Sequence, residues 1–132
     1  MTSPQSFKID TDYDVVFVRK QVRELARAAG LDTTNQARVS LGVSALAQKL
    51  GLGAGFEGEI TLEAIHDEPD RVGVRITLLC ARGVNGGPVA HDLPRSRWVY
   101  MVDELTVAVQ PNGVTRVTAV KWGDLPNSQT HA

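Results

Sequence analysis

Two consecutive stretches near the start of the chain carry apolar residues at helical spacing. In the first, Thr11 is a candidate cap with Asp14 in the first turn, and Gly30 suits a left-handed stop. The apolar residues in between recur every three or four positions: Val15, Val18, Val22, Leu25, Ala26 and Ala29. Residues at this spacing share one face of a helix. The pattern predicts an amphipathic helix that begins at Thr11 to Asp14 and stops at Gly30.

The second stretch predicts another amphipathic helix, joined to the first by a short loop. Thr33 and Gln36 have the spacing of a capping box, and Gly51 ends the pattern. The helix itself is expected from Asn35 to Leu50. Its apolar stripe consists of Ala37, Val39, Val43, Leu46, Ala47 and Leu50.

After a glycine-rich stretch, residues 51–58, the period changes from helical to alternating. Ile60 to Ala64 and Val72 to Cys80 each alternate between faces, and Asp67 to Asp70 has the composition of a hairpin turn. Two further strands, Leu105 to Val109 and Val114 to Trp122, flank a second turn. These segments predict two hairpins.

The region between the two hairpins is predicted as an irregular loop, residues 83–93, followed by a short helix from Pro94 to Asp103. The expected order is strand, helix, helix, strand, strand, short helix, strand, strand. Strands joined by hairpins favour an α+β fold, a two-layer sandwich with a mixed, mostly antiparallel sheet and helices on one face. We expect a single domain over residues 1–132, with its core at about 7–122 and a polar tail at 123–132.

The charge balance and the lone cysteine exclude several kinds of protein. Fourteen basic and fifteen acidic residues give a net charge of −1, which argues against non-specific nucleic-acid binding. A basic stripe at Arg19, Lys20, Arg23 and Arg27 is interpreted as a solvated helix face. Cys80 is the only cysteine, so no intramolecular disulfide forms. No signal-like or membrane-spanning apolar run is present, and no metal-ligand spacing occurs. A cytoplasmic protein without membrane contact is expected.

With this order in place, the sequence resembles the GHKL (Bergerat-fold) ATPase superfamily. Within it, the chain is most similar to the branch of anti-sigma-factor and stressosome serine/threonine kinases, the RsbT–RsbW type. The resemblance runs from about Phe7 to Trp122 and is carried by several separated blocks in the family's order: Asp14–Ala26, Asn35–Val39, Val43–Ala47, Met101–Leu105 and Thr115–Trp122.

The resemblance implies a catalytic pair on the second helix that this chain lacks. In the family a glutamate base stands at the position of Ala45, and an asparagine that binds Mg²⁺ stands at the position of Lys49. Alanine offers no ligand atom and no base, and lysine donates hydrogen bonds but cannot bind a cation. Lys49 could instead contact a nucleotide phosphate as a point charge, or complement the dipole at the end of the helix. No catalytic residue and no metal ligand are therefore expected.

The nucleotide-binding positions implied by the family are also altered. Its adenine-binding aspartate falls at or next to Cys80, interpreted here as a small core residue. Asn85, Gly86 and Gly87 could present backbone N–H groups to phosphates or could form a simple turn. Thr115 matches a family threonine beside the adenine pocket. No cofactor is expected under this interpretation.

The leading hypothesis is a catalytically degenerate switch-kinase homologue that acts as a protein-interaction module. The resemblance implies a partner from sigma-factor or stress signalling: a STAS-domain antagonist, a sigma factor or a phosphatase module. The first helix and the sheet edge are the expected contact surfaces, and a homodimer is left open. The alternatives are an active protein-serine kinase using ATP and Mg²⁺, with Glu57, Glu59 or Asp92 as a displaced acid–base group, and a nucleotide sensor without turnover.

Overall fold

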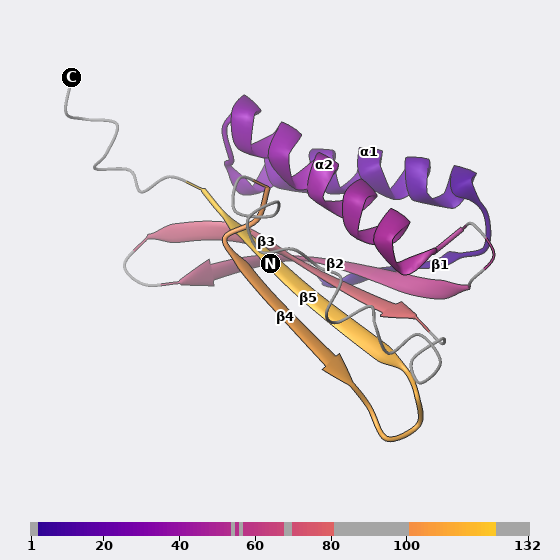
Figure 1. Cartoon of the computed structure of the whole chain (residues 1–132). Helices are drawn as coiled ribbons and strands as arrows, with labels where there is room; N and C mark the ends of the chain where they lie inside the picture. The colour runs from indigo at the N-terminus through magenta and orange to yellow at the C-terminus, as the bar shows by residue number, and fades with distance from the viewer. Residues whose placement is uncertain (1–2, 54, 56, 68–69, 81–100, 124–132) are drawn as a thin grey trace.

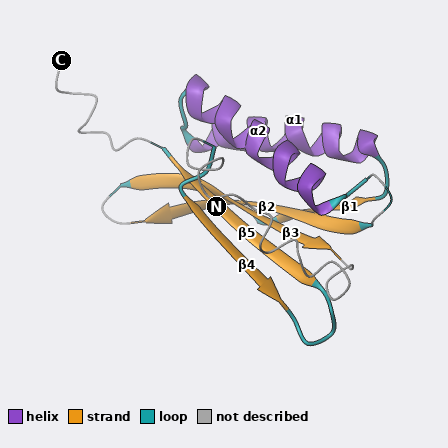
Figure 2. Cartoon of the chain, viewed as in Figure 1, coloured by secondary structure: helices purple, strands orange, loops and turns teal. Residues whose placement is uncertain are grey.

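The computed structural model describes residues 3–53, 55, 57–67, 70–80 and 101–123, which form two layers (Figure 1). One layer is a pair of helices, α1 (Asp12–Ala29) and α2 (Thr33–Leu50). The other is a five-stranded sheet made of β1 (Gln5–Ile9), β2 (Gly58–Asp67), β3 (Arg71–Cys80), β4 (Glu104–Val109) and β5 (Thr115–Trp122). Both helices cover the same face of the sheet (Figure 2). The predicted α+β two-layer sandwich is confirmed.

The strands lie in the order β1-β2-β3-β5-β4, and all described neighbours run antiparallel. The sequence predicted a mixed sheet that is mostly antiparallel, and the described strands show no parallel pair. The reason lies in the connections. Two antiparallel helices, α1 and α2, separate β1 from β2. The chain reverses direction at each of the three connections, so β2 runs opposite to β1. The pairs β2–β3 and β4–β5 are adjacent in sequence and pair as hairpins.

The predicted loop at 83–93 and most of the predicted helix from Pro94 to Asp103 lie outside the described residues. The last three residues of that prediction, 101–103, are described and are not helical. Asp103 is bonded to β5 instead: its N–H donates to the carbonyl of Val120 at 2.7 Å, and its carboxylate accepts from the N–H of Trp122 at 2.6 Å. The buried Lys121 ammonium adds an ion pair at 3.2 Å. These contacts place Asp103 against the sheet, where it leads directly into β4.

The start of α1 agrees with its predicted signals, whereas the start of α2 differs. Thr11 is the N-cap of α1, and the Asp14 carboxylate accepts from the N–H groups of Asp10 and Thr11 at 2.8 and 3.0 Å. The predicted capping box of α2 at Thr33 and Gln36 is wrong. Asp32 caps that helix by accepting from Asn35 N–H at 2.8 Å, and Gln36 donates its side-chain amide to the carbonyl of Leu31. A carboxylate is an effective N-cap, so the helix begins at Thr33 rather than at Asn35.

Glycines in the left-handed conformation end both helices, as predicted. Gly30 has φ of 105° and Gly51 has φ of 75°, and each donates its N–H to carbonyls of the last turn. Within the described residues, neither helix is both long and apolar enough to span a membrane.

The core lies between the helices and the inner face of the sheet. Along β3, every second side chain is fully buried against the helices, namely Val74, Ile76, Leu78 and Cys80, which confirms the predicted alternation. The matching helix positions include Val18, Val22, Val43 and Leu46, all with zero exposed fraction. No described element covers the outer face of the sheet, an arrangement that antiparallel sheets tolerate when that face is polar.

A tryptophan strap holds three strands together on this outer face. The ring of Trp122 in β5 lies over Gly73 of β3, where the β-carbon of any larger residue would approach the ring to 2.7 Å. The Arg71 guanidinium stacks 3.9 Å from the ring centroid, and the indole N–H donates to Glu104 at 2.7 Å. The strap therefore links β3 and β5 to the first residue of β4.

We expect Asp14→Asn to destabilise the protein at neutral pH, because backbone N–H donors of Asp10 and Thr11 hold the pKa of Asp14 below its usual value near 3.8. A lowered folded-state pKa adds stability that is present above the unfolded pKa and is lost as the pH falls through the folded pKa. The difference in Tm between wild type and variant should therefore shrink as the pH falls below 4. Thermal unfolding followed by circular dichroism measures it.

The control is Asp12→Asn, which removes the same charge from the first turn but no bond to the backbone of Asp10 or Thr11. Equal losses in the two variants at neutral pH would show that only the charge near the helix terminus matters.

Candidate nucleotide site

The two family positions on α2, Ala45 and Lys49, lie on one side of the helix. Ala45 is half-buried and packs against the core, whereas Lys49 is exposed in the last turn. Lys49 forms no ion pair with any described residue. Gly42, three residues before Ala45, shares this side of α2, and a β-carbon there would lie 3.3 Å from the side chain of Val102. This side of α2 therefore faces Met101 and Val102, in the segment that precedes β4.

Cys80 and Thr115 form the nearest corner of the sheet, at the end of β3 and the start of β5. They are directly opposite each other in the antiparallel ladder, and both side chains face the helices. Their exposed fractions are 0% and 1%. The Cys80 thiol donates to the carbonyl of Leu50 at 3.6 Å, across the C-terminus of α2. The expectation that Cys80 is a small core residue agrees with this burial.

The Thr115 hydroxyl has a different environment, because it is buried without a hydrogen-bond partner among the described residues. Most buried hydroxyls in native proteins have a partner, and an unpaired one costs free energy. It is therefore the one member of this corner that is chemically unsatisfied in the described part of the chain.

The start of β2 makes a close backbone contact with the end of β3, beside the C-terminus of α2. Gly58 is directly opposite Cys80, and a β-carbon at Gly58 would lie 2.2 Å from the Leu79 carbonyl oxygen. The same β-carbon would lie 2.4 Å from the buried side chain of Leu52. Only glycine leaves room at this position for both the Leu79 carbonyl and the Leu52 side chain.

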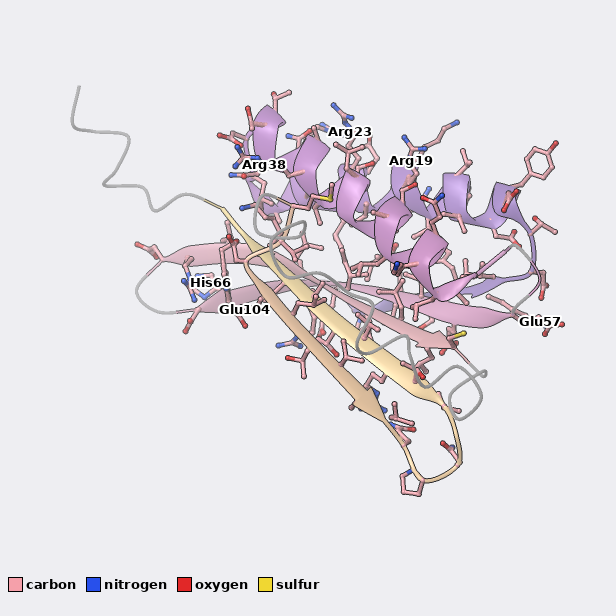
Figure 3. All side chains as sticks on the ribbon, viewed as in Figure 1. Arg19, Arg23, Arg38, Glu57, His66 and Glu104 are labelled. Carbon is pink, nitrogen blue, oxygen red and sulfur yellow. The ribbon has the colours of Figure 1, made fainter. Side chains whose placement is uncertain are left out.

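The other expected site residues are distributed differently. Asn85, Gly86, Gly87 and Asp92 lie outside the described residues. Glu57 is exposed at the end of the molecule where β2 begins (Figure 3).

Glu59 lies opposite Leu79 on the outer face of the sheet, where it alternates with the inward-facing Ile60. A side chain on that face cannot serve as a base beside Ala45, because the sheet separates the two.

A hollow that sequence reasoning missed lies between the two helices. It has a volume of about 340 Å³ and is lined by Asp12, Val15, Val16, Ser44, Gln48 and Leu52. Ser44 and Gln48 each precede a family position by one residue, which turns them about 100° around α2 from Ala45 and Lys49. The hollow is therefore separate from the candidate nucleotide site. Its sequence signal was Val16, an apolar residue outside the buried stripe of α1.

The chemistry available at the candidate site is limited. Its described members supply a thiol, a hydroxyl and an ammonium, and no carboxylate or side-chain amide oxygen to bind Mg²⁺. No group of three or more His, Cys, Asp or Glu residues in the described ranges could hold a metal ion.

We expect Thr115→Val to leave the free energy of unfolding unchanged or to raise it by up to about 1 kcal/mol, because it removes an unpaired buried hydroxyl while keeping the shape. The matched variant Thr115→Ser keeps the hydroxyl and removes a buried methyl group, and should lower the free energy of unfolding by about 1 kcal/mol. Urea denaturation measures both. A loss above about 1 kcal/mol for Thr115→Val would mean that the hydroxyl has a partner.

Comparison with known proteins relates the chain to a bacterial kinase. No family model matches the chain. The serine/threonine-protein kinase RsbT of Bacillus subtilis (strain 168) is 26% identical over 135 aligned residues, which cover 92% of this chain and 98% of RsbT. The similarity runs over nearly the full length of both proteins. The chain is a distant homologue of the kinase RsbT.

Proposed function

We propose that this protein is a catalytically degenerate homologue of RsbT that recognises a protein partner and does not phosphorylate it. The observation that carries the proposal is the pair of residues at the family's catalytic positions, Ala45 and Lys49. Neither has an oxygen atom in its side chain. Phosphoryl transfer depends almost entirely on metal and charge placement, so losing the base and the metal ligand together leaves little acceleration.

The purine-binding position supports the same proposal. Cys80 stands where the resemblance implies an aspartate, and its thiol is bonded to the Leu50 carbonyl inside the core. A thiol so placed has no carboxylate oxygen to accept a hydrogen bond from an adenine amino group. The resemblance implies that such an acceptor binds the adenine amino group.

The first half of α1 offers a surface for a protein partner. Tyr13, Val16 and Phe17 are large apolar side chains with exposed fractions of 84%, 45% and 50%. Phe17 is held in place by an edge-on contact with Phe7 of β1, with ring centroids 5.7 Å apart. Exposed aromatic side chains beside a hollow are typical anchors of protein interfaces. We call Tyr13, Val16 and Phe17 the α1 patch.

The helix layer also carries cations that form no ion pair with a described residue. Arg19, Arg23 and Arg38 project from the helix layer on the side away from the sheet (Figure 3). None of them forms an ion pair with a described residue, whereas Arg27 is paired with Glu24. This surface favours a partner segment that combines apolar and acidic side chains.

The resemblance narrows the class of partner to a STAS-domain antagonist, a sigma factor or a phosphatase module of bacterial stress signalling. Such partners act in the cytoplasm, which is where we place this protein. The proposal requires neither Mg²⁺ nor a nucleotide for binding.

We expect no ATP- or ADP-induced rise in Tm for the purified protein, with or without Mg²⁺. A ligand that binds the folded state must stabilise it by mass action, so absence of binding means absence of a shift. Differential scanning fluorimetry at millimolar nucleotide measures this. A rise of several degrees would contradict the proposal.

The control for this measurement is the double variant Ala45→Glu/Lys49→Asn, which reintroduces the family's catalytic pair. If nucleotide with Mg²⁺ raised the Tm of the variant but not of the wild type, the pocket would still be present, and Ala45 and Lys49 would be the residues that prevent nucleotide binding. Nucleotide binding by the wild type, by contrast, would remove the basis of the proposal.

We expect Tyr13→Ala to weaken binding of a purified STAS-domain antagonist about tenfold, because exposed aromatic anchors carry much of an interface's free energy. Tyr13 is mostly exposed, so the fold should not change. Isothermal titration calorimetry measures the Kd. Lys8→Ala, an exposed change on the outer face of the sheet, is the control and should leave the Kd unchanged. Equal affinities for wild type and Tyr13→Ala would show that the antagonist does not bind at the α1 patch.

A second candidate function is nucleotide binding, either by a kinase with an altered site or by a sensor without turnover. It is favoured by the unpaired Thr115 hydroxyl and by Lys49, whose ammonium is free to contact a phosphate. Equilibrium binding of labelled ATP to wild type and Lys49→Ala tests the sensor. Transfer of labelled phosphate to a STAS-domain protein would establish the kinase.

A further inference from the structure

The strand β4 forms one edge of the described sheet, and its outer side has no described neighbour (Figure 1). Natural proteins usually protect edge strands with lysine, proline or a bulge, because the unpaired backbone groups invite pairing with another chain. From Leu105 to Val109 this strand carries none of these features: its sequence is Leu-Thr-Val-Ala-Val, without a charge. Val109 is 49% exposed.

The direction of the backbone groups follows from the hairpin register. Gln110 donates its N–H to the carbonyl of the directly opposite Val114 at 2.8 Å, which marks a hydrogen-bonded pair. Such pairs alternate along an antiparallel ladder, so Ala108 and Thr106 also bond to β5. The N–H and C=O groups of the remaining residues, Leu105, Val107 and Val109, therefore point outward from the sheet.

The opposite edge of the sheet is better protected. The strand β1 is shorter than β4, carries Lys8 in its second half, and has its Phe7 ring engaged by Phe17 of α1. The two edges thus differ in the features that control edge-to-edge pairing.

The contacts at its first residue hold β4 in place. Asp103 is bonded to β5 through its backbone and carboxylate, and Glu104 accepts from the Trp122 indole. The edge is therefore presented in a fixed extended conformation, which lowers the entropic cost of pairing.

We propose that a second copy of this chain pairs with β4, antiparallel to it, so that two sheets join into one across a two-fold axis. In the register that pairs all of the outward-facing residues, Val107 lies opposite its own copy and Leu105 lies opposite Val109. On the outer face, Thr106 lies opposite Ala108. Apolar side chains therefore meet apolar ones, and small side chains meet small ones, as a self-complementary interface requires.

Charge and backbone chemistry both favour this register and a second copy as the occupant. The only charged residue of the strand, Glu104, would lie opposite the neutral Gln110, so no like charges meet. A shift by two residues in one direction would place Pro111, which has no N–H, opposite Leu105. A shift in the other direction would place Asp103, already bonded to β5, opposite Val109.

Two double variants that differ only at position 106 test the proposal. Thr106 and Ala108 are exposed on the outer face and lie opposite each other across the proposed axis. Thr106→Glu/Ala108→Glu places like charges opposite each other, whereas Thr106→Lys/Ala108→Glu places opposite charges there. Within the chain, Ala108 is next to Arg116 of β5, so a glutamate at 108 should be accepted by the fold in both variants.

We expect the wild type and the Lys/Glu variant to dimerise, and we expect the Glu/Glu variant to have a dimer Kd at least about tenfold higher, from two repulsive pairs. Sedimentation velocity from micromolar to millimolar concentration measures this. Hydrogen exchange should show slowed amides at Leu105, Val107 and Val109 in the dimer and fast ones in the Glu/Glu variant. Equal far-UV circular dichroism and Tm establish that both variants fold.

A wild type that stays monomeric throughout this range would overturn the proposal. So would a dimer that forms equally well in both variants, because its interface would then lie away from β4. Pairing of β4 with a different protein's strand would appear as protection of the same amides only when that protein is added, and would also reject self-pairing. These outcomes are independent of nucleotide binding and of the α1 patch.

Discussion

The contact between the end of α2 and the end of β3 joins the described residues of the candidate nucleotide site. The Cys80 thiol donates to the carbonyl of Leu50, the last residue of α2. Gly58 of β2 leaves room for the Leu79 carbonyl and for the Leu52 side chain that follows the helix. The helix layer and the sheet are thereby joined at one corner. A larger residue at Gly58 would clash with the Leu79 carbonyl within the sheet and with the Leu52 side chain just after α2.

This corner also contains the positions that the resemblance singles out. Ala45 packs against the core, Cys80 fills a buried site, and Lys49 lies in the last helical turn. Each is compatible with stability. Thr115 is the exception, because its buried hydroxyl gains nothing from the described residues.

Periodicity in the sequence predicted both helices, the β2–β3 and β4–β5 hairpins and the alternation along β3, because burial on one face imposes a regular spacing of apolar residues. The errors fall where a single polar contact decides the structure. Asp32 caps α2 where Thr33 was expected to do so. Asp103 bonds to β5, and residues 101–103, which were expected to be helical, are not.

The candidate site was harder to predict than the fold. The positions of Ala45 and Lys49 came from a resemblance, and their shared side of α2 from helical geometry. The hollow beside Ser44 and Gln48 could not be predicted, since it depends on how two helices pack rather than on either sequence alone. The outer-face position of Glu59 follows from strand register, which becomes certain only when the partners of β2 are known.

The tryptophan strap also constrains the register in which β5 pairs with β3. The Trp122 ring can lie flat only where β3 offers no side chain, and Gly73 is flanked on the same face by Arg71 and Arg75. Sliding β5 along β3 by two residues in either direction would place the indole directly opposite Arg71 or Arg75 instead of Gly73. Gly73 thus selects one register of β5 against β3, from several that the alternating apolar residues of these strands would otherwise allow.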